Sequence, residues 1–290
     1  MKNILITGAT GNVGMALIKS LVELNNDFVI YAGIRNTEKD KLSISGFKVK
    51  TTHFDFNDIN SFTPALAGCE ILFLLRPPQI SEVTKIFKPL IEIAIQCAVK
   101  HIVFLSVQGV EKSKIIPHHK IEKLIVKSKI PYTFLRPAYF MQNFTTTLRT
   151  DLVNHHRIFL PAGNAKFTLI DVRDIGKVAA KILSETEKHR NKCYELTNHE
   201  KLTFGEMAEK LSEGLKTTIG YESPNLLRFY ISKRKEKMPT MLILVIIMLH
   251  YLPRFQKEPE TSNWIYKIIN AEPKTFDEFV FENRNVLEVE

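Results

Sequence analysis

The first fourteen residues constrain the fold of this chain more strongly than any other segment. A short apolar run from Ile4 to Ile6 predicts a buried strand that leads directly into Gly8, Gly11 and Gly14. Helical spacing of apolar residues follows from Met15 to Leu24. A strand, a glycine-rich turn and a helix in this order are typical of dinucleotide-binding proteins. The segment predicts a nucleotide site, and the alternative is a strand-to-helix turn that binds nothing.

Each glycine of this turn has its own expected role. Gly8 permits the tight turn, Gly11 lacks a Cβ and lets a pyrophosphate approach the backbone, and Gly14 lets the helix pack close to the strand. The turn residues that we expect to bind the nucleotide are Gly8, Thr10, Gly11, Asn12, Val13 and Gly14.

Strands and helices alternate through the first half of the chain. Apolar or alternating runs predict further strands at 28–34, 47–56, 71–75, 102–105 and 132–135. The segments between them have helical spacing of apolar residues. Near-continuous apolar strands separated by helices indicate an α/β fold with a doubly wound parallel sheet that is covered on both faces.

The pattern changes after Asn143. Short strands are predicted at 158–163 and 167–172, and the second is followed by a helix through 175–182. Thr203 is a good N-cap for another helix, and Glu206 occupies the capping-box position. We expect this part of the chain to form a smaller C-terminal lobe.

A run of nine apolar residues, Met241 to Leu249, lies between Pro239 and Pro253. It is too short to span a bilayer, which takes about 20 residues, so no transmembrane segment is predicted. We expect a buried helix that lines a pocket or forms a contact in a homodimer. The alternative is attachment to a membrane surface, aided by the basic cluster Lys233 to Lys237.

Composition excludes several classes of protein. The 290 residues carry a formal net charge of +9, but Lys and Arg are scattered, so we predict no nucleic-acid partner. The charge excess suits anionic ligands. Three distant cysteines fit a reduced compartment and predict neither a disulfide framework nor a metal site. Because no signal peptide precedes the first strand, we expect a cytoplasmic protein.

The residues after the second and third predicted strands bear on the choice of cofactor. NAD sites usually place Asp or Glu after the second strand, where this chain has Arg35. A guanidinium can pair with a 2′-phosphate, so NADP(H) is favoured over NAD(H). The alternative is that Arg35 is an ordinary surface residue. Asp55 and Phe56 either hold the edge and face of the adenine, or Asp55 caps the turn that follows.

Together, these motifs resemble the NmrA-like branch of the atypical short-chain dehydrogenase/reductase (SDR) superfamily. The segments that carry the resemblance are Gly8–Gly14, Arg35, Pro117–Glu122, Pro131–Pro137, Phe140–Asn143 and Asp171–Ile175. The resemblance implies a Rossmann fold with an NADP(H) site. We therefore expect an NAD(P)-binding domain at 1–148 with a return segment at 167–188. Residues 149–166 and 189–290 would form the smaller substrate-side lobe.

The family resemblance also points to catalytic residues. Typical members of the superfamily use a Tyr and a Lys four residues later, but here Lys114 occupies the Tyr position and His118 the Lys position. By resemblance, His118 hydrogen-bonds the nicotinamide ribose, and Glu122, four residues on, fixes its orientation. The alternative is a histidine at a helix start and an exposed Glu that pairs with Lys.

Further candidates follow strands at the carboxyl edge of the sheet, where ligands bind in open α/β folds. By resemblance, Ser106 supplies the family's catalytic hydroxyl, or it only caps its strand. If a proton donor is required, His119 and Tyr139 are the nearest candidates. The remaining residues expected to contact the cofactor are Leu75, Arg76, Pro77, Val107, Pro137, Ala138 and Phe140.

Two functions are consistent with these features. The first is an NADPH-dependent oxidoreductase that acts on a small, apolar, quinone-like acceptor, whose reduction needs positioning more than a strong acid. The second is a non-catalytic NADP(H)-binding redox sensor that acts through a partner protein, which the missing Tyr favours.

Overall fold

The computed structural model describes residues 2–24, 28–35, 40–41, 44–114 and 116–288. The chain divides into two compact units. The first comprises Met1–Pro137, Val172–Leu196 and Trp264–Ala271, and the second comprises Ala138–Asp171, Thr197–Asn263 and Glu272–Glu290. These bounds differ from the expected ones, because residues 138–148 and 167–171 belong to the second unit and residues 189–196 and 264–271 to the first.

The first unit is built on a seven-stranded sheet in the order β10-β6-β5-β4-β1-β2-β3. Its strands are β1 (Lys2–Ile6), β2 (Phe28–Ile34), β3 (Lys50–His53), β4 (Ile71–Leu75), β5 (His101–Leu105), β6 (Tyr132–Pro137) and β10 (Lys192–Leu196). Every neighbouring pair is parallel. The predicted doubly wound parallel sheet is therefore confirmed.

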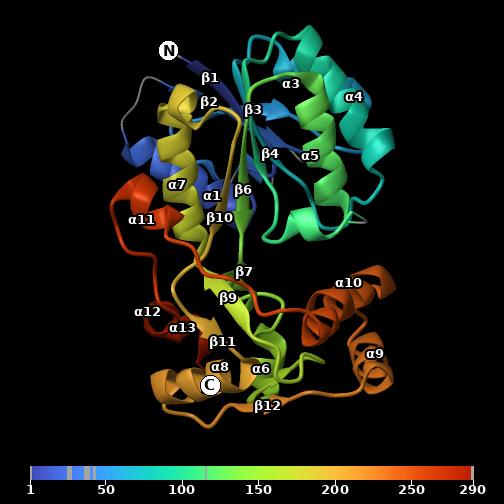
Figure 1. Ribbon diagram of the computed structural model, residues 1–290, viewed down its shortest axis with the longest axis vertical. Coiled ribbons are helices and arrows are strands. Elements are labelled where there is room, and N and C mark those ends of the chain that lie inside the picture. The colour runs from blue at the N-terminus through green and yellow to red at the C-terminus, as the bar shows by residue number, and fades with distance from the viewer. Residues whose placement is uncertain (1, 25–27, 36–39, 42–43, 115, 289–290) are drawn as a thin grey trace. The chain divides into compact units, whose positions relative to one another are not determined.

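Helices cover both faces of this sheet (Figure 1). On one side lie α1 (Asn12–Glu23), α7 (Val172–Ser184) and α11 (Trp264–Ile269), and on the other lie α3 (Phe62–Leu66), α4 (Val83–Gln96) and α5 (Pro117–Ser128). Short 3-10 turns occur at η1 (Ile59–Ser61), η2 (Val110–Lys112) and η4 (Thr186–His189). Phe62, Phe87 and Phe104 are fully buried between the sheet and the second group of helices.

The predicted strand at 47–56 is shorter in the structure, where β3 ends at His53. Asp55 stops it, because its Oδ1 accepts a hydrogen bond from the Asn57 amide at 2.9 Å and closes a tight turn. Phe54 and Phe56 then enter the core with their rings 5.0 Å apart, which is why the apolar pattern continues beyond the strand.

The second unit contains two small sheets, in the orders β11-β9-β7 and β12-β8. Their strands are β7 (Tyr139–Phe140), β8 (Arg157–Phe159), β9 (Phe167–Ile170), β11 (Lys201–Leu202) and β12 (Gly220–Glu222). The helical segments of the unit are η3 (Met141–Asn143), α6 (Arg149–His155), α8 (Phe204–Leu215), α9 (Leu226–Lys235), α10 (Thr240–Tyr251), η5 (Leu252–Phe255), α12 (Phe276–Glu282) and α13 (Arg284–Leu287). The predicted smaller α/β lobe is confirmed.

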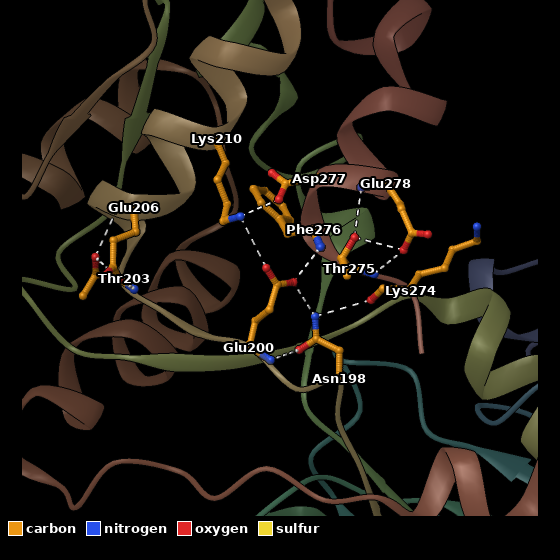
Figure 2. A network of polar contacts seen from close by, with 10 residues as sticks. All are labelled: Asn198, Glu200, Thr203, Glu206, Lys210, Lys274, Thr275, Phe276, Asp277 and Glu278. Atoms are coloured by element: carbon orange, nitrogen blue, oxygen red, sulfur yellow. Dashed lines mark hydrogen bonds and ion pairs between the residues drawn. The ribbon is translucent and has the colours of Figure 1, made fainter. Parts of the chain in front are cut away.

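A polar network joins two helix starts within the second unit (Figure 2). The predicted capping box of Thr203 and Glu206 begins α8, and a second box, Thr275 with Glu278, begins α12. Glu200 lies between the two. It accepts a hydrogen bond from the Phe276 amide at 2.7 Å and lies 3.5 Å from Lys210 Nζ. Because these bonds satisfy backbone amides that a helix start leaves unpaired, they fix where both helices begin.

The apolar run at 241–249 forms the predicted helix, α10, but the prediction that this helix is buried is wrong. Ile243, Ile246 and His250 are buried, whereas Met241 is 67% exposed. Only one face of α10 packs into the core of the second unit, and the other apolar face remains at the surface. Across the described residues, no helix is both long and apolar enough to cross a lipid bilayer.

The packing of α7 on α1 gives a test of the fold. A Cβ at Gly176 would lie 2.6 Å from the Ala16 carbonyl carbon. We expect Gly176→Ala to lower the free energy of unfolding by about 1–3 kcal/mol, because overpacking here outweighs the helix propensity of Ala. The measurement is urea unfolding beside Gly46→Ala, whose Cβ would meet nothing within 4 Å. A neutral or stabilising effect at 176 would contradict the close approach.

Candidate functional site

The glycine-rich turn lies between β1 and α1. Gly8 has a φ of +61°, and its carbonyl accepts a hydrogen bond from the Gly11 amide at 3.0 Å. A Cβ at Gly14 would lie 2.3 Å from that carbonyl oxygen, so this position admits no side chain. Gly11 is the N-cap of α1 and offers no side-chain acceptor to the first amides of the helix. These amides suit an anionic group, because a helix start carries unpaired N–H groups and a positive dipole end.

Thr7 was missed by sequence reasoning, although it holds the turn in place. The residue is fully buried, and its Oγ1 accepts a hydrogen bond from the Leu75 amide at 2.8 Å. This bond joins the carboxyl end of β1 to that of β4, where Leu75, Arg76 and Pro77 leave the sheet. The only sequence signal was a hydroxyl residue at the end of an apolar strand, just before the first glycine.

The residues expected to bind the adenosine half of the dinucleotide differ in their surroundings. Arg35 follows β2 directly, and its side chain is exposed. Asp55 makes the turn-capping bond described above, which is the alternative that the sequence left open. Phe56 is 5% exposed, and its ring packs 5.4 Å from that of Phe87. The Phe56 ring is therefore part of the core.

Ser106 follows β5 and is 4% exposed. Its backbone amide donates a hydrogen bond to the Leu135 carbonyl at 2.7 Å, but its Oγ has no hydrogen-bond partner among the described residues. The strand-end cap that was the alternative role for this hydroxyl is therefore absent from the part of the chain that the structure describes. A buried hydroxyl without a hydrogen-bond partner lowers the stability of the fold, because its desolvation is not compensated. Such a group in a native protein calls for an explanation, and a bound ligand is one. The prediction that Ser106 and Val107 contact the cofactor or substrate is compatible with this unpaired hydroxyl.

His118 lies in the first turn of α5 and contacts Arg76. Arg76 Nε donates a hydrogen bond to His118 Nε2 at 3.4 Å, while its Nη1 donates to the carbonyls of Pro77 and Pro78 at 3.0 and 3.1 Å. A third acceptor of Nη1 is the Ile80 carbonyl, at 2.5 Å. The guanidinium thereby fixes the loop after β4 and positions the imidazole.

Burial lowers the pKa of both His118 and Arg76. Burial, and to a smaller extent the positive charge of Arg76, lowers the pKa of His118 to about 3. Burial also lowers the pKa of Arg76, to about 10. This value is still well above neutral pH, so the guanidinium stays charged. His118 is therefore neutral, and since its Nε2 accepts a hydrogen bond, its proton is on Nδ1.

Glu122 has a different partner from the expected one. Instead of orienting His118, its two oxygens accept hydrogen bonds from Arg136 Nη2 at 2.8 Å and Nε at 3.1 Å. Arg136 projects from β6 and also reaches Glu111 at 3.3 Å. His119 Nδ1 lies 3.2 Å from the Val110 carbonyl. Glu122 and His119 therefore tie α5 to β6 and η2.

Tyr139, Ala138 and Phe140 belong to the second unit, where Tyr139 contacts His250. The Tyr139 hydroxyl lies 3.2 Å from His250 Nε2, and His250 Nδ1 lies 2.6 Å from the Ile246 carbonyl. Nδ1 must donate to that carbonyl, so Nε2 accepts the tyrosine proton. Burial raises the pKa of Tyr139 and lowers the pKa of His250 to about 4. Within this unit, the hydroxyl is committed to a hydrogen bond that joins β7 to α10.

An all-parallel doubly wound sheet, whose first strand turns through glycines into an uncapped helix, defines a dinucleotide-binding protein of the Rossmann type. Comparison with known proteins refines this class. The model of the NmrA-like family matches residues 1–279, so the chain belongs to the NmrA-like family. The resemblance inferred from the motifs is therefore confirmed.

The relatives of this chain include a differentiation protein and quinone oxidoreductases. Prestalk A differentiation protein A of Dictyostelium discoideum is 28% identical over 284 residues, which cover 97% of this chain and 92% of the relative. Quinone oxidoreductase 2 of Escherichia coli (strain K12) is 29% identical over 225 residues, which cover 76% of this chain and 77% of the relative. The crystal structure of an NADPH-dependent quinone oxidoreductase from Escherichia coli has a TM-score of 0.80 at 25% identity, covering 96% of this chain and 98% of that one. Relatives of this chain thus include NAD(P)H-dependent reductases.

The unpaired hydroxyl of Ser106 gives a test of its role. We expect Ser106→Ala to leave the free energy of unfolding unchanged within about 0.5 kcal/mol, because it removes no hydrogen bond, and to weaken cofactor binding or turnover. The control is Thr133→Val. The Thr133 hydroxyl is also buried, but it donates to the His189 carbonyl at 2.8 Å and lies 2.9 Å from His101 Nε2. This variant should lose about 2 kcal/mol of stability. A similar loss at Ser106 would indicate a structural role.

The charge of His118 gives a second test, by NMR titration of its imidazole. We expect the ring to stay neutral down to about pH 5, and Arg76→Gln to raise its pKa by removing the neighbouring charge. Arg234→Gln on α9 is the control and should leave the titration unchanged. A wild-type midpoint near pH 6.5, the ordinary value for histidine, would contradict the buried environment.

Proposed function

We propose that this protein is an NADPH-dependent oxidoreductase that transfers a hydride to a quinone-like or other apolar electrophilic acceptor. The observation that carries the proposal is the buried, unpaired hydroxyl of Ser106, which follows β5 of the dinucleotide-binding sheet. A purely structural residue at this position has no reason to carry a hydroxyl. The reductases among the relatives support the reaction class.

The turn and the second strand would hold the cofactor. The uncapped amides at the start of α1 bind the pyrophosphate, and Arg35, exposed after β2, pairs with the 2′-phosphate. Bound NADPH supplies the hydride. Relatives of this fold have been solved with NADPH and with NAD, so the fold alone does not set the preference. In this proposal, the preference for NADPH depends on Arg35.

Three residues of the first unit would act at the nicotinamide end of the cofactor, where the hydride is transferred. The Nδ1–H group of neutral His118 donates a hydrogen bond to a ribose hydroxyl, and Arg76 keeps the imidazole in that tautomer by donating to Nε2. Ser106 donates a hydrogen bond to the acceptor oxygen. Because the Arg76 guanidinium is half-buried and charged, its field stabilises negative charge that develops on this oxygen.

This arrangement explains how reduction proceeds without the Tyr and Lys of typical SDR enzymes. A quinone that receives a hydride becomes a resonance-stabilised hydroquinone anion, which needs little help from a general acid. A plain ketone would become an alkoxide and would need a strong proton donor. The proposed chemistry therefore selects conjugated acceptors over simple ketones.

A second candidate function is a redox sensor that binds NADP(H) and acts through a partner. The specific observation in its favour is Lys114 at the position of the catalytic Tyr. A relative by fold alone, the negative transcriptional regulator NmrA solved with NAD, has a TM-score of 0.75 at 15% identity. A sensor would bind the cofactor without turnover.

Arg35 gives a test of cofactor preference. We expect Arg35→Asp to weaken NADPH binding by about 10- to 100-fold and NADH binding little, because only NADPH carries the 2′-phosphate. Isothermal titration with both cofactors measures this, and Lys85→Asp on the exposed face of α4 is the matched control. Equal losses for the two cofactors would remove Arg35 from the phosphate site.

Turnover decides between the two functions. Purified protein should oxidise NADPH in the presence of a panel of quinones, faster than NADH, and simple ketones should not be reduced. His118→Ala should lower kcat by about tenfold or more while the fold is retained, since it removes a positioning hydrogen bond. A wild-type sample that binds NADPH but reduces no quinone would favour the sensor. Unchanged kinetics of the variant would exclude His118 from the site.

A further inference from the structure

The segment 226–257 of the second unit, which contains α9, α10 and η5, presents an unusual surface. It holds eight of the 17 large apolar side chains that are exposed among the described residues. The eight are Leu227, Ile231, Met241, Leu244, Met248, Leu249, Leu252 and Phe255. We call this the 226–257 surface. Scattered apolar residues are normal on a protein, but a contiguous group marks a contact with something else.

The exposed residues form a stripe because α10 is apolar on all sides. Its inner face packs into the core through Ile243, Ile246 and His250. On the outer side, positions 241, 244, 248, 252 and 255 recur at intervals of three or four residues, which places them along one face. Phe255, at the end of this row, is 72% exposed. The stripe therefore follows the whole length of α10 and η5.

The same segment concentrates positive charge. It contains seven Lys or Arg and a single Glu, which gives +6 of the chain's +9. Lys233 is the buried exception, since it pairs with Asp151 and Glu236. Of the others, Arg228 pairs with Glu222, and Lys257 lies 3.8 Å from Glu260. The remaining basic side chains of the segment are exposed: Arg234, Lys235, Lys237 and Arg254.

The outer face of α9 repeats this combination on a smaller scale. A shallow groove of about 420 Å³ runs beside Leu227 and Ile231, and it is flanked by Arg228 and Lys235. Apolar side chains beside cations match the acyl chain and the headgroup phosphate of an anionic lipid. A second copy of this chain would instead bring the exposed cations of two such surfaces together, which like-charge repulsion disfavours.

We infer that the 226–257 surface docks the protein on an anionic lipid surface, with the outer stripe of α10 and η5 at the level of the acyl chains. Helices that lie in a bilayer interface combine an apolar face with flanking Lys and Arg, and they bury that face by about 5–10 Å. The 12 residues of α10 are too few to span, so contact is limited to one leaflet. Docking would bring the enzyme to acceptors dissolved in the bilayer, a consequence that rests on the proposed function.

The test is flotation of the full chain with vesicles of phosphatidylcholine alone or with about 30% phosphatidylglycerol, at low and high salt. We expect binding only to the anionic vesicles, weakened by salt because the Lys and Arg contacts are screened. Arg234→Glu with Lys235→Glu, and separately Met241→Ser with Phe255→Ser, should each reduce the partition coefficient by about tenfold or more. All four side chains are exposed, so the fold should survive, and thermal unfolding checks this.

Matched controls come from elsewhere on the surface. Lys123→Glu with Lys127→Glu on α5 makes the same change in net charge, and Phe281→Ser removes a side chain that is 65% exposed on α12. Neither should alter flotation. Equal loss in the controls, equal binding to both kinds of vesicle, or no binding would each overturn the inference. A dimer in sedimentation velocity that Met241→Ser with Phe255→Ser dissociates, without vesicle binding, would assign the surface to a second copy instead. Flotation needs no cofactor or turnover, so its result is independent of the proposed function.

Discussion

The close approach of two backbones at the end of β1 determines what the rest of the first unit can do. Gly14 lies against the Gly8 carbonyl, so α1 must begin at the carboxyl edge of the sheet. Thr7, one residue earlier, fixes β4 to the same edge through the Leu75 amide. Arg76 comes next in the chain and holds His118. A short series of contacts therefore connects a turn that suits phosphate to a neutral imidazole.

Burial of a cation beside a histidine is the second constraint. Within the described residues, the hydrogen-bond partners of the Arg76 guanidinium are three carbonyls and the imidazole of His118, and none is a carboxylate. Carbonyl dipoles compensate the charge less completely than a carboxylate would, so a positive field remains. Such a field suits a site where negative charge develops during reaction. It also keeps His118 neutral, because a second positive charge beside the first would be unfavourable.

Local rules were sufficient wherever the answer depended on neighbouring residues. The apolar runs at 28–34 and 71–75 form strands with those bounds, and the capping box at Thr203 begins α8. Contacts between distant residues could not be predicted in this way. Glu122 accepts hydrogen bonds from Arg136 and not from His118, because β6 passes beside α5. Tyr139 contacts His250, which lies 111 residues further along the chain. The exposure of α10 was missed for a related reason: the apolar run specifies a helix, but how much of its surface the core can cover depends on the neighbouring elements.

Two buried hydroxyls show how the surroundings of Ser106 differ from ordinary core. Thr133 and Ser106 lie on or just after adjacent strands, and both are almost completely buried. The Thr133 hydroxyl is placed between the His189 carbonyl and His101, and burial lowers the pKa of that histidine to about 4. The Ser106 hydroxyl has no such partners among the described residues. Folding alone favours the first arrangement and opposes the second, by the desolvation of one polar group. We therefore propose that the Ser106 hydroxyl serves an interaction outside the fold itself. Its place after a central strand of a dinucleotide-binding sheet makes a bound ligand the simplest source of that interaction.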